Sequence, residues 1–324
     1  MRFLGNTGTV VRVTRRTLGL AVAAVLACLA LPAAALAWGG MYPTGDQYGS
    51  TIAIQVSDSY PVDQALPQTW ATYLGTLVHG PELARLTLDL APIGEVTAIC
   101  GAGALACYDP SSQTIEATPE DQLDSPPAQE IVTHEYGHHI ANNRSNAPWS
   151  AESYGTKRWA SYMQICERTK NGTLAPGDEG TSYRLNPGEA FAEAYRVLNL
   201  TRAGATTIDW EIVDPSFYPD ATALSLLSAD VTAPWTGPTT REVHGSFGYG
   251  TSRMIGVITS LDGSFVARLH APAKSRMSLA LYSGSTLLAH GATVRYAICG
   301  QRALTLKVER QSGAGAFTVD ISKP

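Results

Sequence analysis

The chain has 324 residues, which corresponds to about two domains of ordinary size. Hydrophobic residues make up 44% of it and charged residues 16%, a composition that supports a folded core and excludes a wholly disordered chain. With 23 basic and 28 acidic side chains the net charge is −5, which excludes a nucleic-acid-binding protein that is basic along its whole length.

The N-terminal segment, residues 1–37, has the pattern of a secretory signal peptide. It begins with a basic region that lacks acidic residues, continues as an apolar run from Leu18 to Leu36, and ends with the small-x-small sequence Ala35-Leu36-Ala37. We therefore predict cleavage near Ala37 and a secreted or extracellular mature chain. Sec and twin-arginine export are equal alternatives, and an uncleaved membrane anchor is a third interpretation.

The first part of the mature chain, residues 38–235, mixes strand and helix patterns. Alternating apolar residues predict a strand over Thr51–Val56. Helical spacing runs from Gln64 to Asp89, with an interruption at Gly80-Pro81. Two further strands are predicted over Glu95–Cys100 and Thr114–Ala117.

Three helices are predicted in the rest of this part. Two of them begin at proline, which suits the first turn of a helix because its missing N–H group has no partner there. Their predicted ranges are Pro126–Asn142, Ser150–Arg168 and Pro187–Asn199. These elements predict an α+β fold for residues 38–235.

A change in composition near residues 232–240 indicates a linker between two modules, because Ala-Pro-Trp-Thr-Gly-Pro-Thr-Thr is rich in turn-forming residues. Residues 38–235 carry 9 basic and 24 acidic side chains, whereas residues 236–324 carry 10 basic and 4 acidic ones. In the second module, short β-like runs separated by turn residues predict an all-β sandwich. These runs are Phe265–Leu269, Met277–Tyr282, Leu287–Ala289, Ala303–Val308 and Ala316–Ile321.

Four cysteines follow the predicted signal peptide, and an even number in an exported chain favours disulfides. Cys100 and Cys107 enclose a short flexible segment that closes easily, so they are the first candidate pair. Cys166 and Cys299 would then pair by elimination. Buried free thiols are the alternative.

The sharpest chemical signal is the sequence His134-Glu135-Tyr136-Gly137-His138 inside the predicted helix 126–142. Residues four apart lie on one face of a helix, so His134 and His138 can bind one metal ion. Glu135 lies about 100° further round the helix, where it can accept a proton from a metal-bound water molecule. The neighbouring His139 is predicted to lie outside the ligand set, near the site or on the surface.

A catalytic zinc ion requires a third protein ligand. The metzincin arrangement is excluded, because Ala141 and Arg144 stand where its glycine and third histidine would be. The later predicted helix carries Glu189 and Glu193, four residues apart on one face. One can bind zinc, and the other can accept a hydrogen bond from a ligand histidine.

These motifs resemble those of the gluzincin metallopeptidases, and most closely the catalytic domain of the anthrax lethal factor-like family. The resemblance rests on H-E-Y-G-H together with T-S-Y-R-L-N-P-G-E-A-F-A-E-A-Y-R at residues 181–196. It implies a zincin-like catalytic domain for residues 38–235, in which His134, His138 and Glu189 bind zinc and Glu193 supports a ligand. It also implies that Tyr183 stabilises the oxyanion. The second module resembles the pre-peptidase C-terminal domains of secreted bacterial peptidases, some of which are removed during maturation.

We therefore predict a secreted endopeptidase that binds Zn²⁺ and acts on protein or peptide substrates, with Glu135 as general base. No nucleic-acid partner is expected, and the basic second module is a candidate for contact with a cell surface. One alternative is a secreted binding or adhesion protein whose β-sandwich is functional and whose zinc site is structural or inactive. Another is a toxin-like effector that cuts one host protein.

Overall fold

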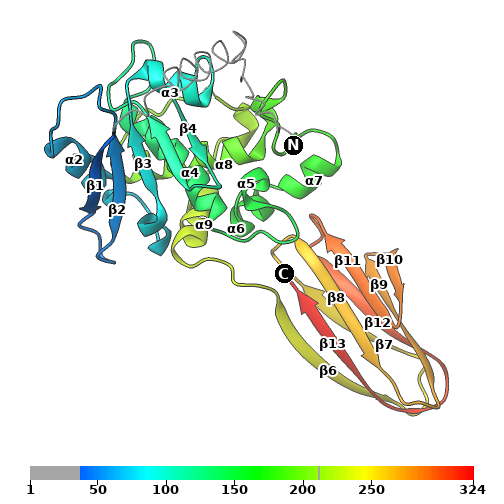
Figure 1. Ribbon diagram of the computed structural model, residues 1–324. Coiled ribbons are helices and arrows are strands. Elements are labelled where there is room, and N and C mark those ends of the chain that lie inside the picture. The colour runs from blue at the N-terminus through cyan, green and yellow to red at the C-terminus, as the bar shows by residue number, and fades with distance from the viewer. Residues whose placement is uncertain (1–36, 211) are drawn as a thin grey trace, which may run out of the picture. The chain divides into compact units, whose positions relative to one another are not determined.

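The computed structural model describes residues 37–210 and 212–324, and the predicted signal peptide lies outside this range except for Ala37. It contains an N-terminal mixed α/β domain and a C-terminal antiparallel β-sandwich, which confirms the predicted fold class (Figure 1). The last helix of the α/β domain ends at Thr232 and the first strand of the sandwich begins at Thr239. The predicted boundary at residue 235 falls between them and stays a prediction.

A five-stranded sheet forms one layer of the α/β domain, in the order β1-β2-β3-β5-β4. The inner three strands are parallel, and both edge strands run antiparallel to their neighbours. Apolar residues alternate along these strands, and those on the inner face, such as Ile54, Leu88 and Ile115, are fully buried. The strands are β1 (Trp38–Pro43), β2 (Thr51–Val56), β3 (Thr87–Leu90), β4 (Ala106–Asp109) and β5 (Thr114–Ala117).

Helices pack with this sheet in one hydrophobic core. The two longest, α4 (Ala128–Asn142) and α8 (Pro187–Arg202), confirm two of the predicted helices. They approach closely because Gly137 has no side chain: a Cβ there would lie 2.7 Å from the Cα of Ala192. The other helices are α2 (Ala65–Thr76), α3 (Ile93–Cys100), α5 (Ala151–Tyr154), α6 (Lys157–Tyr162), α7 (Ile165–Lys170) and α9 (Ala221–Thr232), with 3-10 helices at Pro81–Arg85, Tyr183–Leu185 and Pro215–Phe217.

Two of the predicted elements were assigned the wrong structure. Glu95–Cys100 was predicted as a strand but belongs to helix α3, which follows Pro92. A short apolar run suits either a strand or a helix, and its pattern alone does not separate them. The helical spacing from Gln64 to Asp89 holds only for α2, since the end of that range is the central strand β3.

The predicted helix Ser150–Arg168 is three short helices, α5 to α7. Gly155 lies between α5 and α6, and Gln164 lies between α6 and α7. Their φ angles are positive, 74° and 57°, and each residue ends the preceding helical turn. Periodicity does not reveal these two breaks, because helical spacing of the apolar residues resumes after each turn.

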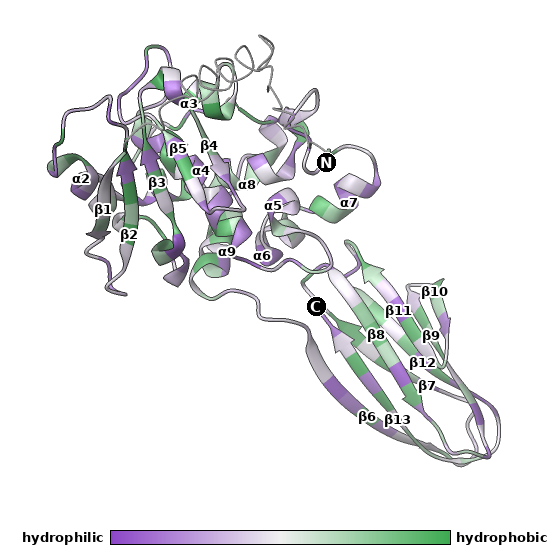
Figure 2. Cartoon of the chain, viewed as in Figure 1, coloured by the Kyte–Doolittle hydropathy of each residue, from purple (hydrophilic) through white to green (hydrophobic). Residues whose placement is uncertain are grey.

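The C-terminal domain packs two four-stranded antiparallel sheets, ordered β10-β9-β12-β7 and β11-β8-β13-β6. Hydrophobic and hydrophilic residues alternate along the strands (Figure 2), and the inward set forms a second core that includes Phe265, Leu281 and Phe317. All five predicted β-runs lie in strands. The strands are β6 (Thr239–Phe247), β7 (Ser252–Ile258), β8 (Gly263–His270), β9 (Arg276–Ser283), β10 (Thr286–Gly291), β11 (Thr293–Ile298), β12 (Ala303–Ser312) and β13 (Gly315–Lys323).

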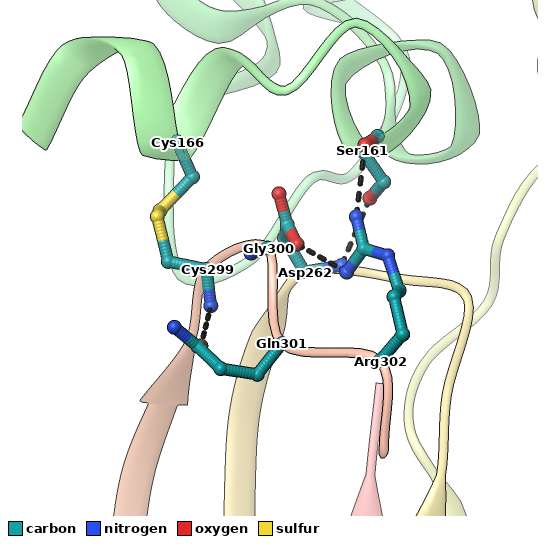
Figure 3. Close-up of a disulfide and its surroundings, with 7 residues drawn as sticks. All are labelled: Ser161, Cys166, Asp262, Cys299, Gly300, Gln301 and Arg302. Carbon is teal, nitrogen blue, oxygen red and sulfur yellow. Dashed lines mark hydrogen bonds and ion pairs between the residues drawn. A yellow bond between two sulfur atoms is a disulfide. The ribbon is translucent and has the colours of Figure 1, made fainter. Parts of the chain in front are cut away.

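Both predicted disulfides are present, Cys100–Cys107 and Cys166–Cys299. The second joins α7 to the end of β11, so it links the two domains covalently (Figure 3). Disulfides are typical of proteins outside the cytoplasm, which favours such a location. Within the described part of the chain, no helix has the length and apolar character needed to span a membrane.

Polar contacts surround the Cys166–Cys299 disulfide (Figure 3). The Arg302 guanidinium donates to the Asp262 carboxylate at 2.6 Å and to the Ser161 carbonyl oxygen at 2.9 Å. The Ser161 hydroxyl oxygen accepts the Asp262 backbone N–H at 2.9 Å. Residues Trp38–Pro324 accordingly form one compact unit rather than two loosely tethered modules.

This link makes a prediction for a chain cut in the linker. If a protease recognition sequence is inserted after Thr236 and cleaved, we expect the two fragments to stay joined in non-reducing denaturing electrophoresis and to separate when reductant is added. The double variant Cys166→Ser/Cys299→Ser should separate without reductant. If the two fragments of the cleaved chain that retains both cysteines separate under non-reducing conditions, the pairing of Cys166 with Cys299 is contradicted.

A second prediction concerns two carboxyl groups on the sheet. Asp89 and Glu116 are neighbours on parallel strands β3 and β5. Burial and the charge of Asp89 raise the pKa of Glu116 to about 7. The folded chain therefore holds this proton more tightly than the unfolded chain, and the free energy of unfolding should fall as the pH rises from about 4.5 to about 7.

Glu116→Gln should remove this fall. We expect a change of about 1–2 kcal/mol, because one pKa unit corresponds to about 1.4 kcal/mol and solvent screens a partly exposed pair. Urea unfolding of the wild type and the variant across this pH range measures it, with the exposed Glu242→Gln as control. Parallel pH curves for the wild type and Glu116→Gln would contradict the prediction.

Candidate metal centre

Three side chains from α4 and α8 converge at one point of the α/β domain. His134 Nε2 lies 3.3 Å from His138 Nε2 and 3.2 Å from Glu189 Oε2. His138 Nε2 lies 3.4 Å from Glu189 Oε1. Among the described residues, these three form the group that could hold a metal ion.

Local sequence positions Glu189 at the start of its helix. The Asn186 side chain caps α8 by accepting the Gly188 backbone N–H at 3.0 Å, and Pro187 occupies the first helical position. Glu189 therefore lies in the first turn, where the helix dipole favours a negative charge. The close approach of α4 and α8 at Gly137 then brings this carboxylate to the two histidines.

Glu193 supports His134 rather than joining the ligand group. Its Oε2 lies 3.1 Å from His134 Nδ1, so the opposite ring nitrogen, Nε2, is directed toward His138 and Glu189. Burial would raise the pKa of the Glu193 carboxyl, but hydrogen bonds from His134 and Arg196 hold it below its ordinary value. Glu193 is therefore an ionised acceptor that orients the histidine ring.

Glu135, the predicted base, lies beside the histidines and lines the same cleft. Burial raises the pKa of its carboxyl, while the charges of His134 and His138 and the backbone N–H of Tyr108 oppose that rise. Glu135 is not one of the three converging ligands, which matches a group that acts on a bound water molecule.

Tyr183 also reaches the centre, as its predicted role requires. Its hydroxyl donates to Glu189 Oε2 at 2.5 Å. Burial and the nearby charge of Glu189 raise the pKa of the hydroxyl, so it remains a protonated donor. Its role toward an oxyanion stays a prediction.

These residues line a cleft of about 1360 Å³. One wall is the segment 101–106, which the Cys100–Cys107 disulfide closes into a loop. Other lining residues come from α5 and from the 177–183 segment. The carboxylate of Glu179, on that segment, accepts a hydrogen bond from Asn186 at 2.9 Å. The cleft is large enough for several residues of a peptide.

His139 departs from its predicted surroundings. It is fully buried, with Nδ1 lying 3.1 Å from the Tyr108 hydroxyl and Nε2 lying 3.0 Å from the Glu82 carbonyl oxygen. Burial lowers its pKa to about 4, so the ring is neutral. Arg144, at the position of a metzincin histidine, instead pairs with buried Glu82 at 2.8 Å. Both side chains are structural.

Sequence analysis missed three residues near the site. Tyr108 lines the cleft, Asn186 caps α8, and Arg196 pairs with Glu193. A signal existed for Arg196, because a charge pair three residues apart on a helix is readable in the sequence. Asn186 directly precedes Pro187, which is a typical helix start. Nothing in the sequence indicates that Tyr108 lies at the cleft.

No known protein family matches this chain, and no curated protein matches it. Two solved structures are similar to its C-terminal part. The mitogen of Yersinia pseudotuberculosis is 14% identical, with 27% of this chain and 87% of that chain covered and a TM-score of 0.23. The periplasmic g-type lysozyme inhibitor PliG of Aeromonas hydrophila is 7% identical, with 28% and 90% covered and a TM-score of 0.24. Similarity at this level does not bear on function.

Proposed function

We propose that this protein is an exported zinc-dependent endopeptidase. The observation that carries the proposal is the convergence of His134, His138 and Glu189 in a large cleft, with the additional carboxylate of Glu135 beside them. A purely structural metal site has no use for Glu135. The predicted signal sequence and the two disulfides support export.

The donor set supports zinc as the metal. Two imidazole nitrogens and one carboxylate oxygen are a common catalytic zinc set, which leaves a position for water. Ligand atoms about 2.0–2.2 Å from a tetrahedral zinc ion lie about 3.3–3.6 Å from one another. The two histidine Nε2 atoms lie 3.3 Å apart, and the Glu189 carboxylate approaches them through different oxygens, Oε2 at 3.2 Å from His134 and Oε1 at 3.4 Å from His138, so the three side chains are close enough to share one ion.

The mechanism follows from where each side chain lies. Bound zinc would lower the pKa of its water molecule and polarise the scissile carbonyl. Glu135 would accept a proton from the attacking water molecule on its carboxylate and deliver it to the amine nitrogen as the peptide C–N bond breaks. The Tyr183 hydroxyl donates a hydrogen bond to the developing oxyanion. Glu193 keeps His134 in the tautomer that presents Nε2 to the metal.

The substrate class is a protein or peptide. The cleft volume of about 1360 Å³ accommodates several residues of a peptide, and the motifs resemble those of the gluzincin and lethal factor-like peptidases. The basic C-terminal domain, with 10 basic and 4 acidic side chains, is the part suited to contact an anionic cell surface. A binding protein with an idle zinc site is the competing function.

Two measurements on the purified mature chain test the proposal: zinc content by elemental analysis, and cleavage of unstructured casein with and without chelator. We expect one zinc ion per chain and cleavage that stops when zinc is removed and returns when it is restored. Zinc binding without cleavage of casein or of a diverse peptide library would favour the binding-protein alternative. A chain that binds no zinc would overturn the ligand assignment.

A further inference from the structure

Arg196 is the last residue of the motif at residues 181–196, and its side chain makes several polar contacts near the metal centre. It lies on α8, one turn after Glu193, with a side chain that is 5% exposed. Its guanidinium donates to Glu193 Oε2 at 3.0 Å and to Glu193 Oε1 at 2.5 Å. It also donates to the Glu130 carboxylate and, at 2.5 Å, to the Asp209 carbonyl oxygen.

The contact with Glu193 uses both carboxylate oxygens, so it defines the plane of that group and not merely its charge. The same Oε2 lies 3.1 Å from His134 Nδ1. Glu193 is fully buried, so these two side chains supply its hydrogen bonds in the intact chain. Arg196 therefore lies at the end of a chain of contacts that runs through Glu193 and His134 to the metal position.

The other two contacts reach different walls of the cleft. Glu130 lies on the first turn of α4, the helix that carries both histidines, and Asp209 lies in the segment after α8. Both residues line the cleft, as Arg196 does. One guanidinium thus fastens α4, α8 and the 205–210 segment to one another beside the ligands.

We propose that Arg196 is a positioning residue for the metal centre, which orients His134 through Glu193 and holds the cleft walls against it. The inference rests on the proposed function only in requiring that zinc binds at His134, His138 and Glu189. It adds that zinc affinity depends on a residue that touches no ligand directly.

The test is the zinc dissociation constant, measured by competition with a chelator on the full mature chain. We expect Arg196→Ala to weaken zinc binding about 10–100-fold, the range found when partners of ligand residues are removed. Arg196→Lys should also weaken it, because an ammonium group cannot bond both oxygens of Glu193 in a fixed plane. The exposed Arg202 on the same helix provides the matched control, Arg202→Ala.

Two further readouts separate positioning from general stability. Added guanidinium ion should restore zinc affinity to Arg196→Ala and leave Arg202→Ala unchanged. In the Co²⁺-loaded protein, Arg196→Lys should alter the visible absorption, which reports ligand geometry. Wild-type zinc affinity in Arg196→Ala and Arg196→Lys would overturn the proposal. If the wild type itself binds no zinc, the metal centre fails and the inference fails with it. Should Arg196→Ala not fold, Arg196→Lys carries the test.

Discussion

Replacement of Glu135 by glutamine is expected to abolish peptide cleavage and to leave zinc bound. Glutamine has nearly the same shape and keeps an oxygen that can accept a hydrogen bond. It cannot accept a proton from water at neutral pH. General acid–base catalysis contributes about 10²–10⁴-fold, so we expect kcat to fall by that factor. Zinc content should stay at the wild-type value, because Glu135 is outside the ligand group.

The matched control is Glu152→Gln, the same chemical change on an exposed carboxylate that lines the same cleft. It should keep kcat close to that of the wild type. For the wild type, Glu135→Gln and Glu152→Gln, zinc content is measured by elemental analysis and kcat from initial rates on one peptide substrate. Wild-type turnover by Glu135→Gln would show that another group takes the proton. Loss of zinc from Glu135→Gln would show that this carboxylate holds the metal.

Replacement of Glu189 by glutamine is expected to remove the metal and, with it, the activity. The Glu189 carboxylate reaches both histidine Nε2 atoms, at 3.2 and 3.4 Å. A neutral amide is a much weaker zinc ligand than a carboxylate. Because a bound metal stabilises the folded state, added Zn²⁺ should raise the Tm of the metal-free wild type and leave that of Glu189→Gln unchanged.

Two other glutamates serve as comparisons. Glu193→Gln should keep zinc with an affinity reduced about 10–100-fold, since Glu193 contacts His134 at Nδ1 and not the metal position. Glu179→Gln, also in the cleft, should respond to zinc as the wild type does. Isothermal titration with Zn²⁺ separates the three cases. If Glu193→Gln loses zinc and Glu189→Gln retains it, the roles of the two carboxylates are the reverse of those assigned above.

Much of the local structure could be predicted because it depends on neighbours in the chain. The spacing of His134 and His138 places them on one helical face, and prolines mark the starts of α4 and α8. Alternation identified β2, and short β-like runs between turn residues identified five strands of the sandwich. The two disulfide pairs followed from an even cysteine count and one short loop.

The errors occur where long-range pairing overrides a local pattern. Thr87–Leu90 becomes a strand because β2 and β5 flank it in the sheet, and no periodicity in four residues reveals that. Ile93–Cys100 is a helix although its apolar run also suits a strand. His139 is buried against Glu82 and Tyr108, which are 57 and 31 residues away in the chain.

The sequence by itself determined which side chains could bind a metal or take part in catalysis: two histidines on one face of a helix, a glutamate beside them, and two later glutamates on one face of another helix. Only the tertiary structure decided which of those glutamates meets the histidines. The outcome depends on how closely α4 and α8 pack at Gly137 and Ala192. It also depends on Arg196, which forms an ion pair with the Glu193 carboxylate. Helical spacing is a property of neighbouring residues, whereas the meeting of two helices depends on packing between segments some 55 residues apart.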